Sequence, residues 1–275
     1  LLDINELPKP WHINPFVVRG YTFATTIPKC IQNTPRLSNE AFNIWSYVLG
    51  VLSVLYLAYY HYPSTTVYAQ ASATDNLIIG IYLAAATLCL NCSIFWHSMK
   101  CHCYLHFMIS CVSVDLMCAT VMISAMNVAK QYTAFYCEPS LQRLYLSITA
   151  ICGVTSLVLG WSPKFRHPEL AFVRVIVFTL LGIVGLLPIV HLAMTRGSEW
   201  AWLFYKLVWL EVVAPIFSVA WTYAGKIPER WWPGMFDFCG HSHNVWHIAV
   251  LTTVRVGYKV ALGLLRMVSE GGCVV

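Results

Sequence analysis

Long, uninterrupted runs of apolar residues dominate the chain. A helix needs about 20 apolar residues to cross a hydrocarbon core roughly 30 Å thick, and seven windows of that kind occur. They are 41–62, 77–97, 107–129, 143–161, 171–194, 201–224 and 243–265. The runs are continuous, as in LIIGIYLAAATLCL from Leu77, and lack the alternation typical of barrel strands. The pattern therefore predicts an all-α membrane protein, a bundle of seven transmembrane helices.

The composition excludes two other classes of protein. Of the 275 residues, 58% are apolar and 11% are charged, whereas soluble domains carry about 25% charged residues. An aromatic content of 14% is the reverse of a disordered chain. The formal net charge of +5 falls far short of a nucleic-acid-binding balance. We therefore expect membrane lipid as the main partner and no nucleic acid.

Basic residues are distributed unequally between the two sides of such a bundle. The N-terminal segment and the even-numbered loops hold nine, namely Lys9, Arg19, Lys29, Arg36, Lys100, Lys164, Arg166, Lys226 and Arg230. The opposite side holds four, namely Lys130, Arg143, Arg196 and Arg266. Because cytoplasmic loops are enriched in Lys and Arg, this difference predicts a cytoplasmic N-terminus. With seven spans, the C-terminus is then lumenal or extracellular.

Three segments follow from this topology: a cytoplasmic N-terminal segment (1–40), a seven-transmembrane domain (41–265) and a short lumenal or extracellular tail (266–275). No basic stretch followed by a short apolar run opens the sequence, so we expect no secretory signal peptide. The first segment is rich in proline and carries mixed charge. Its aromatic residues leave two alternatives open, docking at lipid headgroups or folding against the helix ends; they are Trp11, Phe16, Tyr21 and Phe23.

A pair of histidines one helical turn apart opens the last apolar run. His243 and His247 in GHSHNVWHIAV are spaced i, i+4 and share one helix face. Both imidazoles can therefore reach a single metal ion, and imidazole is a preferred ligand of zinc. His241 could replace one of the pair in another register. Taken alone the spacing is a weak signal, because interfacial histidines are common.

The topology adds a third histidine at the same depth. The second span runs inward and ends at His97, at the level where the seventh span begins. Three protein ligands with a fourth position open are typical of catalytic zinc sites. Asp115 lies about 12 Å into the third span, where an ionisable group is costly and usually has a partner or a function. Ser93 precedes His97 by one turn and shares its face.

Other residues with chemical potential leave alternatives open. A dense Cys/His cluster in one short loop comprises Cys101, His102, Cys103 and His106. Because the usual zinc-finger spacing is absent, we expect a reduced or palmitoylated loop there in preference to a metal site. Glu211 in the sixth span is equally consistent with lining a cavity and with an interhelical hydrogen bond. The sequence offers no explanation for Arg255 in the seventh span.

Several ordered motifs resemble those of the progestin and adipoQ receptor (PAQR) family, and the resemblance covers nearly the whole chain. They are LSNEAFNIWSYVLG from Leu37, CSIFWH with Ser93 and His97, Asp115 in the third span, and KIPERWWPGMFDFCGHSHNVWH from Lys226. Within the family, LSNEAFNIWS, the Cys and His that follow CSIFWH, and AFYCEPSLQRLYL most resemble the Golgi member that traps Raf kinase. The adiponectin receptors are more distantly similar.

The resemblance implies roles for particular residues. Adiponectin receptors bind zinc through three histidines, whose counterparts by motif are His97, His243 and His247. Asp115 corresponds to the aspartate that holds the water on the zinc, and Ser93 to the motif serine near the pocket. Those receptors are linked to ceramide hydrolysis. The Golgi member is instead described as a scaffold that anchors Raf kinase through its cytoplasmic N-terminal part.

Three functions follow as expectations. The first is a Golgi-membrane regulator that tethers Raf kinase and dampens growth-factor signalling, with the plasma membrane as the alternative location. The second is a zinc-dependent, ceramidase-like amide hydrolase in which Asp115 orients the water or takes its proton and Ser93 hydrogen-bonds the developing oxyanion. The third is a signalling receptor of the adiponectin or progestin type, with ceramide or a steroid-like ligand bound within the bundle.

Overall fold

The computed structural model describes residues 1–162, 170–199, 201–202, 204, 206, 208–209 and 218–271. The chain divides into two compact units. The first comprises Leu1–Leu52, Leu90–Asp115 and Val212–Thr253, and the second comprises Ser53–Cys89, Leu116–Glu211 and Val254–Val275.

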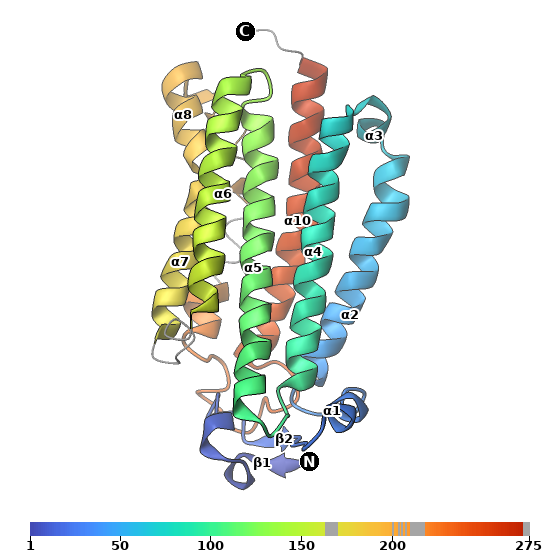
Figure 1. The fold of residues 1–275 in the computed structure, drawn as a ribbon, viewed down its shortest axis with the longest axis vertical. Helices are drawn as coiled ribbons and strands as arrows, with labels where there is room; N and C mark the ends of the chain where they lie inside the picture. The colour runs from blue at the N-terminus through green and yellow to red at the C-terminus, as the bar shows by residue number, and fades with distance from the viewer. Residues whose placement is uncertain are drawn as a thin grey trace. The chain divides into compact units, whose positions relative to one another are not determined.

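Six helical stretches in the described part of the chain are long and apolar enough to cross a membrane: Ala41–Ser64, Ala73–Met99, Leu105–Ala134, Pro139–Trp161, Ile176–Arg196 and Ser242–Gly271. They contain α2 (Ala41–Tyr56), α4 (Ala73–Met99), α5 (Leu105–Ala134), α6 (Pro139–Trp161), α7 (Ala171–Val184), α8 (Leu187–Arg196) and α10 (Ser242–Gly271) (Figure 1). Each stretch coincides with one of the seven expected spans. The remaining span, 201–224, lies partly outside the described residues, because 203, 205, 207 and 210–217 are not among them. The chain is thus a multi-pass helical membrane protein.

In the first unit, the N-terminal segment has its own small fold. Strands β1 (Leu2–Asp3) and β2 (Arg19–Tyr21) pair antiparallel, and helix α1 (Ile27–Asn33) follows (Figure 1). Apolar side chains of this segment share one core with the ends of α4 and α5; its buried members are Ile4, Leu7, Trp11, Val17, Tyr21, Ala24, Cys30, Trp96, Met99, Cys101, Met108 and Cys111. The segment therefore folds against the helix ends.

This core decides between the two alternatives for the aromatic residues of the segment. Trp11 and Tyr21 are 8% and 9% exposed, and the Tyr21 hydroxyl donates to the backbone carbonyl of Val17 over 2.8 Å. Headgroup docking is therefore wrong for these two side chains. Backbone hydrogen bonds join the segment to the α4–α5 loop as well, because Ala24 N donates to Cys101 O and Cys103 N donates to Ala24 O, both over 2.8 Å.

In the second unit, α6 and α7 lie side by side (Figure 1), and the helix formed by α7 and α8 is interrupted between them. Pro188 has no N–H group, so the carbonyl of Val184 loses its helical donor. The amide of Gln131, on α5, replaces that donor over 3.1 Å. The amide of Asn127 likewise donates to the carbonyl of Leu181 over 2.7 Å. In lipid such carbonyls must be satisfied by the protein itself.

We expect Gln131→Leu to destabilise the protein by about 1 kcal/mol, because it leaves the Val184 carbonyl unpaired in the bundle. It also removes the acceptor of the Thr149 hydroxyl, 2.7 Å away. Thermal unfolding in detergent measures the effect. Pro188→Ala restores an N–H that can reach the Val184 carbonyl, so Gln131→Leu should cost less in that background. An equal cost in both backgrounds would contradict the account.

Candidate metal centre

The helix that carries two of the predicted ligands begins at a buried carboxylate. Ser242 is the first residue of α10, and its backbone N–H donates to Glu229 Oε2 over 2.7 Å while its hydroxyl donates to Glu229 Oε1. Glu229 is fully buried and also accepts a hydrogen bond from Asn14 Nδ2 over 2.9 Å. A carboxylate at a helix N-terminus satisfies a free N–H and interacts favourably with the helix dipole. Glu229 thereby fixes where the first turn of α10 starts.

Three imidazoles converge on one point in the first unit. The Nε2 atom of His97, in the last turn of α4, lies 3.0 Å from His247 Nε2 and 3.2 Å from His243 Nε2. His97 and His247 are 2% and 1% exposed. Among the described residues, these three side chains form the group of metal-ligating atoms that lie within 4.8 Å of one another. The structure thus brings together the three histidines that the sequence singled out.

This arrangement fits the donor set of a tetrahedral zinc site. Zinc–nitrogen bonds are about 2.0–2.1 Å long, so two ligand nitrogens on a tetrahedral ion lie roughly 3.3 Å apart. The distances of 3.0 and 3.2 Å are close to that spacing. All three donors are neutral nitrogens when deprotonated, as zinc binding requires. Three ligands would leave a fourth position open.

A carboxylate on the other side of His97 sets the orientation of its ring. Glu40 Oε2 lies 2.6 Å from His97 Nδ1, so this nitrogen donates its proton and Nε2 keeps its lone pair. Such carboxylate–histidine pairs orient metal-bound imidazoles and raise their basicity. Lys100 donates to Glu40 Oε1. Burial alone would raise the pKa of Glu40, but Lys100 and then His97 hold that pKa well below its ordinary value.

The first turns of α2 and α10 are tied together beside the three imidazoles. Asn43 Nδ2 donates to Glu40 Oε2 over 2.9 Å, and Asn43 Oδ1 accepts from Asn244 Nδ2 over 2.7 Å. The Tyr47 ring stacks on the His247 ring with centroids 3.9 Å apart. Glu40, Asn43 and Tyr47 are spaced i, i+3, i+7 on one helix face. Side chains on this face therefore contact the histidine cluster and hold it in place.

The two remaining predicted site residues lie next to the cluster. Ser93 is one turn before His97 on α4 and is 5% exposed. Its hydroxyl is within hydrogen-bonding reach of the Asp115 carboxylate on α5, and Asp115 is in electrostatic range of His97. An acid, a hydroxyl and three imidazoles thus share one site within the first unit.

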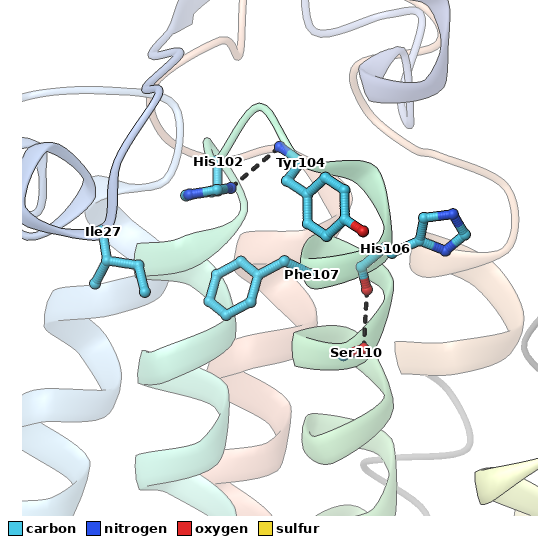
Figure 2. A pocket seen from close by; sticks show the side chains of 6 residues that line it. All are labelled: Ile27, His102, Tyr104, His106, Phe107 and Ser110. Atoms are coloured by element: carbon cyan, nitrogen blue, oxygen red, sulfur yellow. Dashed lines mark hydrogen bonds between the residues drawn. The ribbon is translucent and has the colours of Figure 1, made fainter.

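The other predicted ligands do not converge. The His241 ring is stacked 6.5 Å from that of His243 and is not part of the three-histidine group, so the structure does not bring His241 into the pair. The Cys/His loop likewise forms no metal-ligating group among the described residues. Figure 2 shows its two imidazoles, His102 and His106, pointing apart. Both line an open pocket of about 350 Å³. His102 instead makes an edge contact with Phe107.

The sequence left the roles of Glu211 and Arg255 open, and the structure describes only Arg255. Glu211 lies outside the described residues. Arg255 is exposed on α10, as is Lys259 one turn later, so the two bases share an exposed face of that helix.

Sequence reasoning missed Glu40, Asn43 and Lys100. The signal was present, because Glu40 and Asn43 stand in LSNEAFNIWS, a motif used only for its resemblance. The partner of Glu40 is His97, 57 positions away, and the partner of Asn43 is Asn244, 201 positions away, so no local pattern links them. Lys100 is three residues after His97 and reads as an ordinary basic loop residue. Only packing shows that it pairs with Glu40.

Fold and site together define a multi-pass helical membrane protein with a buried cluster of three histidines. Residues 36–258 match the haemolysin-III related family, and the chain belongs to this family, which includes the progestin and adipoQ receptors.

Several curated relatives are similar over most of the chain. An adiponectin receptor protein of Drosophila melanogaster is 30% identical over 258 residues, covering 92% of this chain and 57% of the relative. An ADIPOR-like receptor of Saccharomyces cerevisiae is 32% identical over 235 residues, covering 83% and 43%. Progestin and adipoQ receptor family member 3 of Homo sapiens is 27% identical over 251 residues, covering 90% and 80%. The chain thus spans about half the length of the first two relatives.

We expect Glu40→Gln to weaken zinc binding by roughly 10–100-fold, the usual effect of losing the partner of a metal-bound imidazole. The amide cannot balance Lys100 and no longer favours a proton on His97 Nδ1. Competition with a fluorescent zinc chelator measures the affinity of the purified protein. Glu6→Gln, at an exposed position of the N-terminal segment, is the matched control. Equal affinity in the two variants would remove Glu40 from the site.

Proposed function

We propose that this chain is a zinc-dependent membrane hydrolase of lipid amides such as ceramide, with His97, His243 and His247 as the zinc ligands. The observation that carries the proposal is the convergence of the three Nε2 atoms beside the Asp115–Ser93 pair. A histidine cluster alone would serve a structural metal equally well. An acid and a hydroxyl at the same place are what hydrolysis additionally requires.

Each residue has a task in this proposal. When bound, zinc supplies Lewis acidity, which lowers the pKa of a water molecule to about 7 and polarises an amide carbonyl. Asp115 accepts the proton of the attacking water and later delivers it to the leaving amine. The Ser93 hydroxyl donates a hydrogen bond to the oxygen that gains charge. Glu40 keeps His97 in the tautomer whose Nε2 faces the site.

The proposal includes the topology predicted from the basic residues: seven spans, with residues 1–40 cytoplasmic and 266–275 lumenal or extracellular. Cys137, in the turn between α5 and α6, is disulfide-bonded. Disulfides persist in oxidising compartments, which supports a lumenal or extracellular place for this turn. Cys30, Cys101 and Cys103, on the proposed cytoplasmic side, are free thiols. The three histidines would then lie near the cytoplasmic end of their helices.

A signalling receptor is the second candidate, favoured by the names of the relatives, which are called adiponectin receptors or progestin and adipoQ receptors. In this role zinc would stabilise the site and a lipid or steroid-like ligand would shift the bundle between states. Raf kinase tethering and Golgi residence stay predictions of the motif resemblance. Any test of tethering must use surface variants, because deleting residues 1–40 would remove seven of the 12 buried side chains in the core that this segment shares with the ends of α4 and α5.

We expect Asp115→Asn to keep zinc and to lower the rate of ceramide hydrolysis by roughly 10²–10⁴-fold, because the amide cannot accept a proton. Purified protein in detergent with a fluorescent short-chain ceramide measures the rate, and atomic emission measures the zinc. Asp3→Asn, in the N-terminal segment and outside the metal-ligating group, should behave as wild type. Wild-type protein that holds zinc but cleaves no lipid amide would refute the hydrolase and leave the receptor.

We expect His247→Ala to lose the metal, while His241→Ala retains one zinc per chain. Both substitutions remove a buried imidazole from the start of α10, so the pair separates loss of a ligand from a general effect of truncation. Zinc content of the purified variants is the measurement. Loss of zinc in both variants, or in neither, would contradict the assigned ligand set.

A further inference from the structure

Three large apolar side chains are exposed close together in the segment that leads into α10. Trp231, Trp232 and Met235 are 62%, 54% and 71% exposed, and the two indole rings meet edge to face with centroids 5.8 Å apart. Pro233 and Gly234 make the turn between Trp232 and Met235, and Gly234 has φ +80°, a conformation that favours glycine. Residues 231–235 are called the aromatic tip below. Such contiguous exposed apolar surface marks a contact site.

The buried carboxylates of Glu229 and Asp237, one on each side of the aromatic tip in sequence, hold its backbone in place through hydrogen bonds. Glu229 binds the start of α10 and Asn14. Asp237 is 2% exposed and accepts hydrogen bonds from Val18 N over 2.7 Å and Arg19 Nε over 3.1 Å. Within the tip, Gly234 N donates to Phe16 O over 3.1 Å. The side chains are therefore presented by a fixed backbone, with little conformational entropy left to lose on contact.

The charge beside the tip is positive. Residues 226–240 contain four ionisable side chains other than cysteine and histidine, namely Lys226, Glu229, Arg230 and Asp237. Both acids are buried, whereas Arg230 is exposed and Lys226 is partly exposed. Arg19, which pairs with Asp237, keeps a side chain that is 66% exposed. Within residues 226–240, the charged side chains that reach the surface are therefore cations.

We propose that the aromatic tip docks into the anionic headgroup layer of the leaflet that α10 enters. The tip ends seven residues before Ser242, where this candidate span begins, so chain length holds it near the bilayer surface. Tryptophan prefers the headgroup level of a membrane, and neighbouring Lys and Arg are attracted to anionic lipids. Because Glu229 joins this segment to the first turn of α10, lipid contact would steady that turn. The inference is independent of the proposed hydrolysis.

The test uses the whole chain reconstituted in nanodiscs. The chain has 11 tryptophans, so the signal of interest is the difference between wild type and the double variant Trp231→Phe, Trp232→Phe. This difference should be quenched by lipids brominated near the glycerol backbone and should be several-fold less sensitive to acrylamide than free tryptophan. The protection should increase when phosphatidylserine replaces part of the phosphatidylcholine, and Arg230→Gln should abolish that increase.

Control variants keep the experiment decisive. Trp11→Phe removes a buried tryptophan and should leave both the lipid and the acrylamide response of the tip unchanged. Thermal unfolding confirms that each variant is folded. A difference signal that acrylamide quenches fully and brominated lipid does not would overturn the proposal. Protection that requires added cytosolic extract would assign the tip to a protein partner and would also overturn it.

Discussion

A polar group buried in an apolar bundle has to find its partner within the protein, because lipid offers no hydrogen bonds. In the first unit this constraint shapes the histidine cluster. Glu40 occupies a largely buried position, with 14% of its side chain exposed, and His97, Lys100 and Asn43 surround its two oxygens with donors. The same pairing leaves the Nε2 face of His97 turned toward the other two imidazoles. A carboxylate satisfied by its neighbours thus determines which side of the ring is available for a metal.

The same constraint operates in the second unit, with no connection to a metal. The helix break before Pro188 frees backbone carbonyls, and amide side chains of α5 occupy them. The carboxylate of Asp75 is buried at the start of α4 and accepts from Tyr132, Tyr136 and the backbone of Ser72. Buried acids and amides therefore do not by themselves mark a functional site in this protein. The histidine cluster is distinguished by three donors that face one another.

The N-terminal segment is an integral part of the first unit. Its Asn14 and Arg19 bind the two buried carboxylates that flank the aromatic tip, and its apolar residues complete the core at the ends of α4 and α5. A segment that stabilises the entry to α10 also stabilises the helix that carries two of the three imidazoles. This gives a physical reason for motifs before the first span and before the last one to occur together.

The amino-acid sequence alone determined the class of fold, because the length and apolarity of a spanning helix are local properties. It also determined that His243 and His247 share a face, since i, i+4 spacing suffices, and topology brought His97 to the same end. Tertiary structure decided the rest. That Glu40 faces His97 and Asn43 faces Asn244, or that His102 and His106 point apart, depends on how helices and loops distant in sequence pack. Periodicity specifies which face of a helix is apolar, but the partner of each polar side chain is set by contacts that form only on folding.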